Sequence, residues 1–502
     1  MNASTFPEQV ERFRGLIADR LGLQFEEART AWLAEVLGRR VDASGVTADP
    51  YLAQLQVALP SAELAALARE LTVGETYFFR NIEQFNALRE RVAPECLRPT
   101  GARRCLRILS AGCASGEEPY SIAMALHDLV ADASCDLQIR AVDLNPASLE
   151  KARQARYTTW SLRETPPAMQ QRWFRPDGAG VVLDDAIRAS VKFEARNLGE
   201  DDAELWQPGA YDVVFCRNVL MYFTPRGTQA LVARIARALV PNGTLFLGSA
   251  ETLRGLSQAF HLQHTHGSFY YQRKDPAEQA ASPRGMAPDA ARPDLAAVVD
   301  DSGSWVEAIG RASERVRALT GRPTSSGSSM ALTPRPWNLG PALELFRQER
   351  FAHALSLVRA LPDEAAGDPN VLLLHAVLLA HSGQFSSAED TCRQLLAIDE
   401  LNAGAHYVLA LCREGLGDSR GSADSDQFAI YLDPTFAMPR MHLGLLARRA
   451  GDREAARREL GQAVTLLQRE DASRLLLFGG GFRREALLAL CRAELQACGG
   501  AA

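Results

Sequence analysis

The chain has 502 residues, more than one hydrophobic core usually organises, so two or three domains are expected. Hydrophobic residues make up 47 % and charged residues 23 %, which is the composition of a globular protein. With 55 basic and 61 acidic residues the net charge is −6, which excludes a global field that favours nucleic acid or insertion at an anionic membrane.

The N-terminal segment MNASTFPEQVERFRG has no basic region followed by an apolar run, so no secretion signal is expected. The longest apolar stretch, Val371 to Ala380, has about half the length of a membrane span. Nine scattered cysteines without a CxxC pair favour a reduced, cytoplasmic protein and give no support for a metal site.

Residues 1 to about 90 are expected to be helical, because apolar residues recur at three- and four-residue steps, as in Val10, Phe13 and Ile17. This segment also carries six arginines: Arg12, Arg14, Arg20, Arg29, Arg39 and Arg40. A basic helix face could steer an acidic partner. The alternative is an ordinary solvated face, since glutamates are interleaved with these arginines.

From about residue 104 to 273 the chain alternates between apolar runs and helical periodicity. The expected strands are Leu106–Ser110, Ile139–Val142, Val191–Ala195, Tyr211–Cys216 and Thr244–Gly248. The expected helices between them are Ser121–Val130, Ala147–Ala155 and Gln229–Leu239. This alternation predicts an α/β fold with a parallel sheet covered on both faces, and His261–His266 with Phe269–Gln272 predicts a terminal hairpin.

Residues 274–335 are rich in Ala, Pro, Ser, Gly and Asp and predict a flexible linker, which a short helix around Trp305–Leu319 interrupts. The tail repeats with a period of 34 residues. The series are Gly383, Gly417 and Gly451; Ala342, Ala376, Ala410 and Gly444; and Ala354, Ala388, Ser422 and Ala456. This period resembles the tetratricopeptide repeat and predicts about four helical hairpins, followed by a cap near Arg474–Gln496. The alternative is a helical bundle in which the spacing arises by chance.

The strongest local motif is LRILSAGCASGEEPYS, residues 106–121. An apolar strand ends at Ser110, and Gly112 and Gly116 permit a tight turn before a helix. Two carboxylates, Glu117 and Glu118, open that helix, where they would repel a pyrophosphate and suit a cationic ligand. The alternative is an ordinary helix start, where acids are favourable.

Further polar residues follow the other strands. Asp143 lies at the end of the second strand, where an acid can accept hydrogen bonds from ribose hydroxyls or simply cap the next helix. Cys216 and Arg217 end another strand, at the edge where open α/β sheets bind ligands. GETYFFRN, residues 74–81, reads by itself as core aromatics beside a surface charge.

Four segments in this order and spacing resemble the CheR family of chemotaxis receptor methyltransferases: GETYFFRN, SAGCASGEEPYSIAM, AVDLNPASLEKAR and FCRNVLMYF. The resemblance spans residues from about 10 to 273. It implies a Rossmann-like class I methyltransferase domain with S-adenosylmethionine as methyl donor and a receptor glutamate as acceptor. The implied domains are an N-terminal helical subdomain (1–90), a cofactor-binding domain (91–273) with an antiparallel β-subdomain at about 157–190, a linker (274–335) and an all-α repeat solenoid (336–498).

The resemblance also implies roles for individual residues. Arg80 and Tyr222 would be catalytic, Arg80 beside the acceptor carboxylate and Tyr222 beside the transferring methyl group. The cofactor would be bound by Gly74, Thr76, Arg80, Glu118, Asp143, Asn197, Leu198, Cys216 and Arg217. Glu117 is adjacent to Glu118, so either could be the acid that holds the cofactor's amino group.

Two features depart from the family pattern. Cys113 and Ala114 are conservative changes in the glycine turn, whereas RPDGAGVVLDDAIRAS is shorter than the turn of members that dock on a receptor tether, which puts tether binding in doubt. The repeat tail resembles a subset that serves alternative pathways such as surface sensing or biofilm control. Its expected partner is a protein or peptide.

The expected reaction is therefore methyl esterification of glutamate on the cytoplasmic helices of a methyl-accepting receptor. Two other hypotheses remain open at the level of sequence. One is a catalytically weak scaffold that acts through its repeats, which failure to bind the cofactor would favour. The other is a small-molecule methyltransferase, which a broad pocket for free carboxylic acids would favour.

Overall fold

The computed structural model describes residues 7–72, 74–97, 105–133, 135–275, 337–480 and 482–499. The chain divides into two units, residues 1–284 and 285–502. Nearly all of the predicted linker, including the predicted helix Trp305–Leu319, lies outside the described residues.

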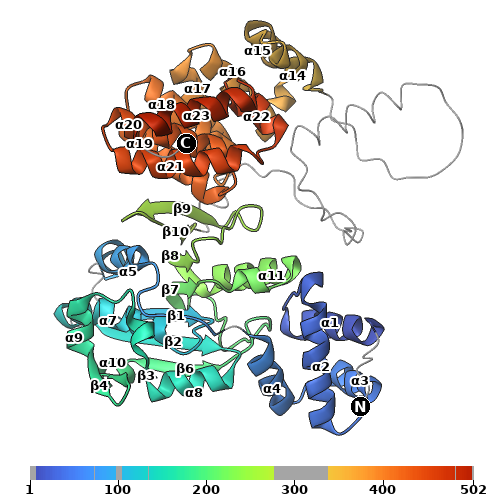
Figure 1. Ribbon diagram of the computed structural model, residues 1–502, viewed down its shortest axis with the longest axis vertical. Coiled ribbons are helices and arrows are strands. Elements are labelled where there is room, and N and C mark those ends of the chain that lie inside the picture. Colours follow the sequence, from blue (N-terminus) through green and yellow to red (C-terminus); the bar gives the residue numbers. More distant parts are fainter. Residues whose placement is uncertain are drawn as a thin grey trace, which may run out of the picture. The chain divides into compact units, whose positions relative to one another are not determined.

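Unit 1 begins with four amphipathic helices (Figure 1). These are α1 (Pro7–Leu21), α2 (Thr30–Ser44), α3 (Ala48–Val57) and α4 (Ser61–Leu71), with a 3-10 turn, η1 (Glu27–Arg29). Val10, Phe13, Ile17 and Leu21 of α1 are buried, as their spacing predicts. The predicted helical N-terminal segment is thus confirmed.

The arginines of these helices mostly have partners within the same segment. Arg40 binds Glu63 at 2.6 Å, Arg39 binds Glu70 at 2.7 Å, and Arg14 binds Glu11 at 2.6 Å. Charges neutralised in this way leave little net field to steer a partner. The structure therefore favours the interpretation of this segment as a solvated face rather than a basic docking face.

The centre of unit 1 is a seven-stranded sheet in the order β6-β2-β1-β7-β8-β10-β9. Its strands are β1 (Cys105–Ala111), β2 (Asp136–Asp143), β6 (Val191–Ala195), β7 (Tyr211–Cys216), β8 (Leu239–Leu247), β9 (Phe260–Thr265) and β10 (Ser268–Arg273). The first five pair in parallel, and β10 pairs antiparallel with both β8 and β9. The predicted parallel sheet and terminal hairpin are both confirmed.

Helices connect and cover these strands. They are α5 (Ile82–Ala87), a π-helical turn η2 (Leu88–Val92), α6 (Ala93–Cys96), α7 (Glu117–Asp132), α8 (Pro146–Gln154), α9 (Pro167–Trp173), α10 (Asp185–Ala189) and α11 (Pro225–Ala238), with 3-10 turns η3 (Thr159–Leu162) and η4 (Leu220–Tyr222). Between α8 and β6 lies a separate antiparallel sheet of β3 (Arg156–Tyr157), β5 (Gly180–Leu183) and β4 (Phe174–Asp177). The small antiparallel insertion is present as expected.

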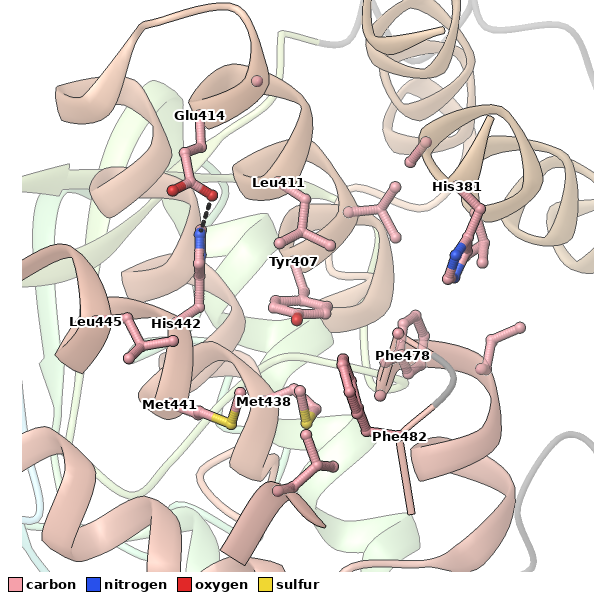
Figure 2. Close-up of a pocket in the computed structure, with 18 of the residues that line it drawn as sticks. His381, Tyr407, Leu411, Glu414, Met438, Met441, His442, Leu445, Phe478 and Phe482 are labelled. Atoms are coloured by element: carbon pink, nitrogen blue, oxygen red, sulfur yellow. Dashed lines mark hydrogen bonds and ion pairs between the residues drawn. The ribbon is translucent and has the colours of Figure 1, made fainter. Parts of the chain in front are cut away.

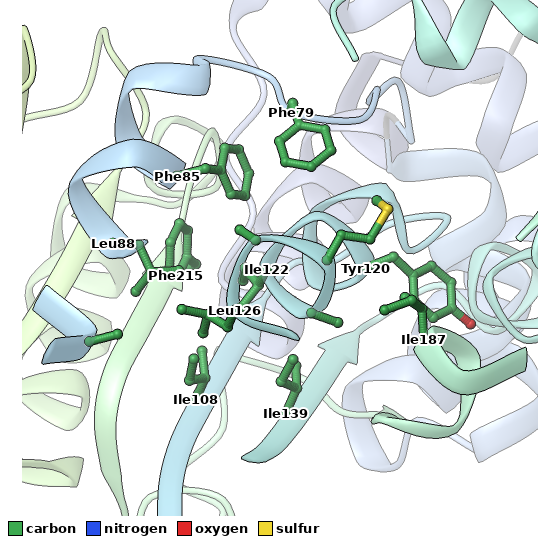
Figure 3. Close-up of a cluster of buried hydrophobic side chains, with 14 of the residues drawn as sticks. Phe79, Phe85, Leu88, Ile108, Tyr120, Ile122, Leu126, Ile139, Ile187 and Phe215 are labelled. Carbon is green, nitrogen blue, oxygen red and sulfur yellow. The ribbon is translucent and has the colours of Figure 1, made fainter. Parts of the chain in front are cut away.

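The main core of unit 1 lies between α7 and the sheet (Figure 3). Ile122 and Leu126 of α7 are fully buried in the same cluster as Ile108 of β1 and Ile139 of β2. Phe85 of α5 stacks on Phe215 of β7, with ring centroids 6.0 Å apart. The segment that follows the N-terminal helices, residues 78–97, therefore packs into the core of the sheet, which fixes the turn carrying Arg80 against the strands.

Unit 2 is a run of antiparallel helix pairs (Figure 1). The helices are α14 (Gly340–Arg347), α15 (Phe351–Arg359), α16 (Pro369–His381), α17 (Phe385–Ile398), α18 (Ala403–Gly415), α19 (Ser419–Leu432), α20 (Ala437–Arg449), α21 (Arg453–Leu467), α22 (Ala472–Phe478) and α23 (Arg484–Ala497), with a 3-10 turn η5 (Asp363–Ala365).

The 34-residue series of the sequence have a direct structural meaning. Gly383, Gly417 and Gly451 lie between the two helices of a pair with positive φ (71°, 88° and 83°), a conformation that glycine adopts without strain. At Gly444 a side chain would overlap Leu460 of the neighbouring helix, so a residue without a Cβ allows α20 and α21 to pack closely.

Candidate active site

The turn after β1 forms one wall of the site. Gly112, Ala114 and Gly116 all have positive φ (79°, 46° and 92°), so the chain reverses within five residues and enters α7. The backbone N–H groups of Gly112 and Cys113 donate to the carbonyl of Val142 at 2.8 and 3.0 Å. These bonds tie the turn to the end of β2 and set Asp143 beside it.

Asp143 is held by its own backbone neighbours. Its Oδ2 accepts from the Ala114 N–H and its Oδ1 from the Asn145 N–H, both at 2.8 Å. Burial raises the pKa of the Asp143 carboxyl, while these N–H groups oppose that shift. A carboxylate fixed in this way keeps lone pairs for a ligand, and Asp143 does line a cavity.

The two adjacent acids of α7 have different surroundings. Glu117 is 3 % exposed and its Oε2 accepts from Ser115 Oγ at 2.7 Å. Glu118 accepts from Ser110 Oγ at 2.7 Å and from Arg217 Nη1 at 3.2 Å, and of the two it is Glu118 that lines the cavity. The structure thus favours Glu118 as the acid available to a ligand.

Arg217 connects three parts of the site. It binds Glu118, and its Nη2 donates both to the backbone carbonyl of Arg80 and to Asn81 Oδ1. The Arg217 side chain is only 3 % exposed, so these bonds are made away from water, where they are strongest. Arg217 therefore fixes the turn that presents Arg80.

Two adjacent cavities lie at the carboxyl edge of the parallel strands, with volumes of about 100 and 390 Å³, and share Gly112, Ala114, Asn218 and Tyr222 in their walls. Of the predicted site residues, Gly74, Asp143, Asn197, Leu198 and Tyr222 line the smaller cavity. Thr76, Arg80, Glu118, Arg217 and Tyr222 line the larger one. Cys216 lines neither, because it is fully buried within β7 beside Leu247 of β8.

Further residues line these cavities that sequence reasoning did not single out. In the smaller cavity they are Leu21, Leu23, Phe25, Leu71, Thr72, Leu144, Ser148, Asn218, Val219 and Phe223, and in the larger one Glu75, Tyr77, Arg163 and Met221. Most of them lie within or next to the four motifs that resemble the family, so their position in the sequence could have indicated them. Leu21, Leu23 and Phe25 have no such signal, because they come from the N-terminal helical segment.

That N-terminal segment is paired with the segment containing Tyr222. The Gln24 N–H donates to the Tyr222 carbonyl at 2.8 Å, and the Thr224 N–H donates to the Gly22 carbonyl at 2.9 Å. Leu23 and Phe223 form an antiparallel bridge. The helical segment therefore closes the site and holds the backbone of Tyr222 in place.

The donor set fits S-adenosylmethionine. The smaller cavity has apolar walls from Leu198, Leu144 and Phe25 with the Asp143 carboxylate at its edge, which suits a flat purine and a ribose diol. The larger cavity offers the Glu118 carboxylate, which suits an ammonium group. Among the described residues no cluster of His, Cys, Asp and Glu has the arrangement of a metal site.

Unit 2 contains a separate cavity of about 570 Å³ (Figure 2). Tyr407, Met438, Met441, Phe478 and Phe482 belong to its largely apolar wall. Such a flexible, thioether- and aromatic-lined surface is typical of peptide-binding grooves.

A charge cluster forms part of the wall of this cavity, which Glu414 and His442 line. His442 Nδ1 is 2.7 Å from Asp426 Oδ2, and His442 Nε2 is 2.8 Å from Glu414 Oε2. Although burial lowers the pKa of His442, the two carboxylates hold it at about 9. The hydrogen bond from His442 lowers the pKa of Glu414 to about 2, while burial raises that of Asp426 to about 6.

Comparison with known proteins agrees with this geometry. Residues 74–268 match the family described as CheR methyltransferase, SAM binding domain. A probable biofilm formation methyltransferase WspC of Pseudomonas aeruginosa is 31 % identical over 453 residues, covering 89 % of this chain and 96 % of that protein. Chemotaxis protein methyltransferase 2 of Vibrio cholerae is 33 % identical over 279 residues, covering 54 % of this chain and 96 % of that protein.

Among solved structures, PcrH from Pseudomonas aeruginosa matches 28 % of this chain and 96 % of its own, at 20 % identity and a TM-score of 0.23. A MamA structure matches 34 % of this chain and 89 % of its own, at 18 % identity and a TM-score of 0.24. Structural similarity at these TM-scores and identities does not indicate function.

Proposed function

Because the chain belongs to the CheR methyltransferase family, we propose that it esterifies glutamate side chains on the cytoplasmic helices of a methyl-accepting receptor. The observation that carries this proposal is the pair of adjacent cavities at the sheet edge. One is apolar with Asp143 at its edge, and the other contains Glu118, Arg80 and Tyr222. S-adenosylmethionine is the methyl donor and supplies a methyl group attached to a positively charged sulfur.

The acceptor needs no activation by a base. A glutamate side chain has a reference pKa of about 4.3, so it is ionised near neutral pH and can attack a methyl carbon directly. Transfer converts a carboxylate and a sulfonium into a neutral ester and a neutral thioether. The task left to the protein is therefore to position the two reactants and to exclude water.

Arg80 and Tyr222 are the residues that we assign to this positioning. Both line the larger cavity, and Tyr222 also lines the smaller one, so its side chain lies where the two cavities adjoin. Arg80 orients the acceptor carboxylate, and the Tyr222 side chain orients the methyl group. A full bidentate grip by Arg80 would lower the nucleophilicity of the carboxylate, so we propose a partial contact.

The surroundings of the larger cavity support a protein acceptor that is acidic. The Arg163 guanidinium lines it and lies 3.7 Å from the centre of the Tyr77 ring and 4.6 Å from that of Trp160. Two cations, Arg80 and Arg163, thus attract carboxylates to the opening. Met221 in the cavity wall is 64 % exposed and Trp160 is 67 % exposed, and exposed apolar side chains of this size favour contact with a protein surface.

The cellular setting is also proposed. All nine cysteines are free, which supports a reduced compartment such as the cytoplasm. None of the described helices is long and apolar enough to cross a membrane. Similarity over 89 % of the chain to proteins named as probable biofilm formation methyltransferases supports a surface-sensing or biofilm pathway.

For unit 2 we propose a protein or peptide partner in the cavity of Figure 2. Its apolar lining, with Met438, Met441 and Phe482, supports an occupant with bulky apolar side chains. The variant Met441→Glu tests this proposal. We expect it to lose a peptide that co-purifies with or cross-links to the wild-type chain, while methyl transfer to an isolated receptor domain stays unchanged. Retention of the peptide by that variant would contradict the assignment.

The test of the enzymatic proposal is transfer of labelled methyl from S-adenosylmethionine to receptor signalling domains from the same cell. We expect label that mild alkali releases and that maps to glutamate. A receptor domain with those glutamates changed to glutamine is the control and should remain unlabelled. Tight cofactor binding without transfer to any receptor, but with transfer to free carboxylic acids, would favour the small-molecule hypothesis; absence of cofactor binding would favour the scaffold hypothesis.

A further inference from the structure

Glu251 lies in the turn after β8 and is 6 % exposed. Its Oε2 accepts from the N–H groups of Asn218 and Gly248 at 2.7 and 2.8 Å. Its Oε1 accepts from Val219 at 2.8 Å and from Met221 at 3.4 Å. One buried carboxylate thus collects four backbone N–H groups from two turns.

Three of these donors belong to the segment that carries Tyr222. Asn218 follows β7 with a positive φ of 57°, and Val219 leads into the short turn η4, Leu220–Tyr222. Hydrogen bonds to an ionised acceptor are roughly twice as strong as neutral ones. The carboxylate therefore compensates for the cost of a left-handed residue and fixes the direction in which the turn leaves the sheet.

The surroundings of Glu251 are shaped to admit it. At Gly248 a Cβ would lie 2.8 Å from Glu251 Oε2 and 3.0 Å from the Asn218 backbone nitrogen, so a side chain there would separate the two turns. Because β7 and β8 are adjacent and parallel, their carboxyl ends bring both turns to the same edge of the sheet.

We propose that Glu251 is a positioning residue for methyl transfer, which acts by fixing the Asn218–Tyr222 turn between the cofactor and the acceptor. Glu251 does not line either cavity, whereas Asn218 and Tyr222 line both, so it acts through the turn. The Gln24 N–H and the Tyr222 carbonyl hold the far end of the same turn, and Glu251 holds its beginning. This inference rests on the methyl transfer proposed above.

The variant that tests it is Glu251→Gln, which keeps the shape of the side chain. An amide has one oxygen and one NH₂ group, so it can accept from only one of the two donor pairs and presents hydrogens to the other. We expect kcat to fall about 100-fold, the loss that a displacement of about 1 Å at a reacting group can cause. The Kd for S-adenosylmethionine and the KM for the receptor domain should stay within about threefold.

Asp212→Asn is the matched control. The Asp212 carboxylate also accepts a backbone N–H, that of Arg107 at 2.8 Å, and binds the same arginine's guanidinium at 3.0 Å. It lies on β7, the strand that leads into the Asn218–Tyr222 turn, but at the end of that strand away from the turn. We expect this variant to lose stability while kcat stays within about threefold of wild type.

Amide hydrogen exchange of the full-length chain supplies a readout that does not depend on the acceptor. In Glu251→Gln we expect faster exchange at Asn218, Val219 and Met221, which Asp212→Asn should leave unchanged. A kcat within about threefold of the control, a loss carried by Kd or KM instead of kcat, or unchanged exchange in this turn would each overturn the inference. If the wild-type chain transfers no methyl group, the proposed function fails and Glu251 has no role in methyl transfer, whereas the exchange result still decides whether Glu251 fixes the turn.

Discussion

Replacement of Gly112 by alanine tests whether the turn after β1 must approach the turn after β7. Gly112 has a φ of 79°, and a Cβ built on it would overlap Cγ2 of Val219. Both residues line the smaller cavity, and Gly112 lines the larger one as well. The substitution therefore adds strain at the backbone and also pushes Val219 away from its place in the wall.

The expected cost has two parts. A left-handed conformation costs a residue with a Cβ about 1–2 kcal/mol, and overpacking a filled site costs about 1–3 kcal/mol. The free energy of unfolding of unit 1 should therefore fall by about 2–5 kcal/mol. Because the added methyl group stands in the wall of the smaller cavity itself and displaces the Val219 side chain there, the Kd for S-adenosylmethionine should rise at least about tenfold.

Gly45→Ala separates the two parts. Gly45 ends α2 with a φ of 68°, and a Cβ there would have no atom within 4 Å. This variant should lose only the backbone share, about 1–2 kcal/mol, and bind the cofactor as wild type does. Denaturant unfolding and calorimetric titration measure both quantities. If Gly112→Ala bound S-adenosylmethionine with the wild-type Kd and lost no more stability than Gly45→Ala, the close approach of the two turns would be refuted.

Three further predictions concern single side chains. Glu118→Gln should weaken the binding of S-adenosylmethionine about 10- to 100-fold by removing a charge-assisted hydrogen bond. In the same titration the binding of 5′-methylthioadenosine, which lacks the α-ammonium and α-carboxylate groups, should be almost unaffected; equal losses for both ligands would argue against a contact to the ammonium group. Arg80→Ala should lower kcat between about 10- and 100-fold in the methyl-transfer assay at saturating S-adenosylmethionine, and unchanged turnover would exclude Arg80 as the orienting residue. The pKa of His442 in the folded protein, about 9, lies above its ordinary value of 6.5. Protonated His442 therefore stabilises unit 2 fully below about pH 6.5, and this contribution is lost as the pH rises through 9. Between pH 7 and pH 10 the free energy of unfolding of unit 2 should therefore fall by at most about 3 kcal/mol in wild type and by less in His442→Gln. If the free energies of unfolding of the two proteins changed in parallel with pH, the assigned ion pairs would be contradicted.

The sequence predicted the fold class because its signals are local and repeat. Strands such as Tyr211–Cys216 are buried on both faces of the sheet, so they read as continuous apolar runs in the sequence. The 34-residue period survives in the tail because the units share a left-handed turn position, held by Gly383, Gly417 and Gly451 and by Glu349 (φ 59°) in the first unit, and a small residue at the helix contact. The motifs around Gly112, Asp143 and Arg217 could be recognised because each lies on a single strand-to-helix turn.

Other features of the site depend on contacts between distant segments, which no local pattern encodes. Whether Glu117 or Glu118 faces the ligand is decided by the partners Ser115 and Arg217, and Arg217 lies 99 residues from Glu118. Cys216 ends β7, a strand whose carboxyl end does reach the cavities, but its side chain is fully buried in the core. Side chains alternate between the two faces of a sheet, and this one lies on a buried face.

The sequence thus determined the parallel sheet, the repeat tail and two acids at the sheet edge, Glu118 and Asp143, for which we propose contacts to the ammonium group and the ribose of S-adenosylmethionine. Tertiary structure alone decided how the site is held together. Leu23 pairs with Phe223 across 200 positions of the chain, and Glu251 reaches Asn218 across 33. Such contacts form only when β7 and β8 are neighbours and the N-terminal helices close over their ends, because hydrogen-bonded backbone groups of two turns carry no side-chain pattern that a sequence could display.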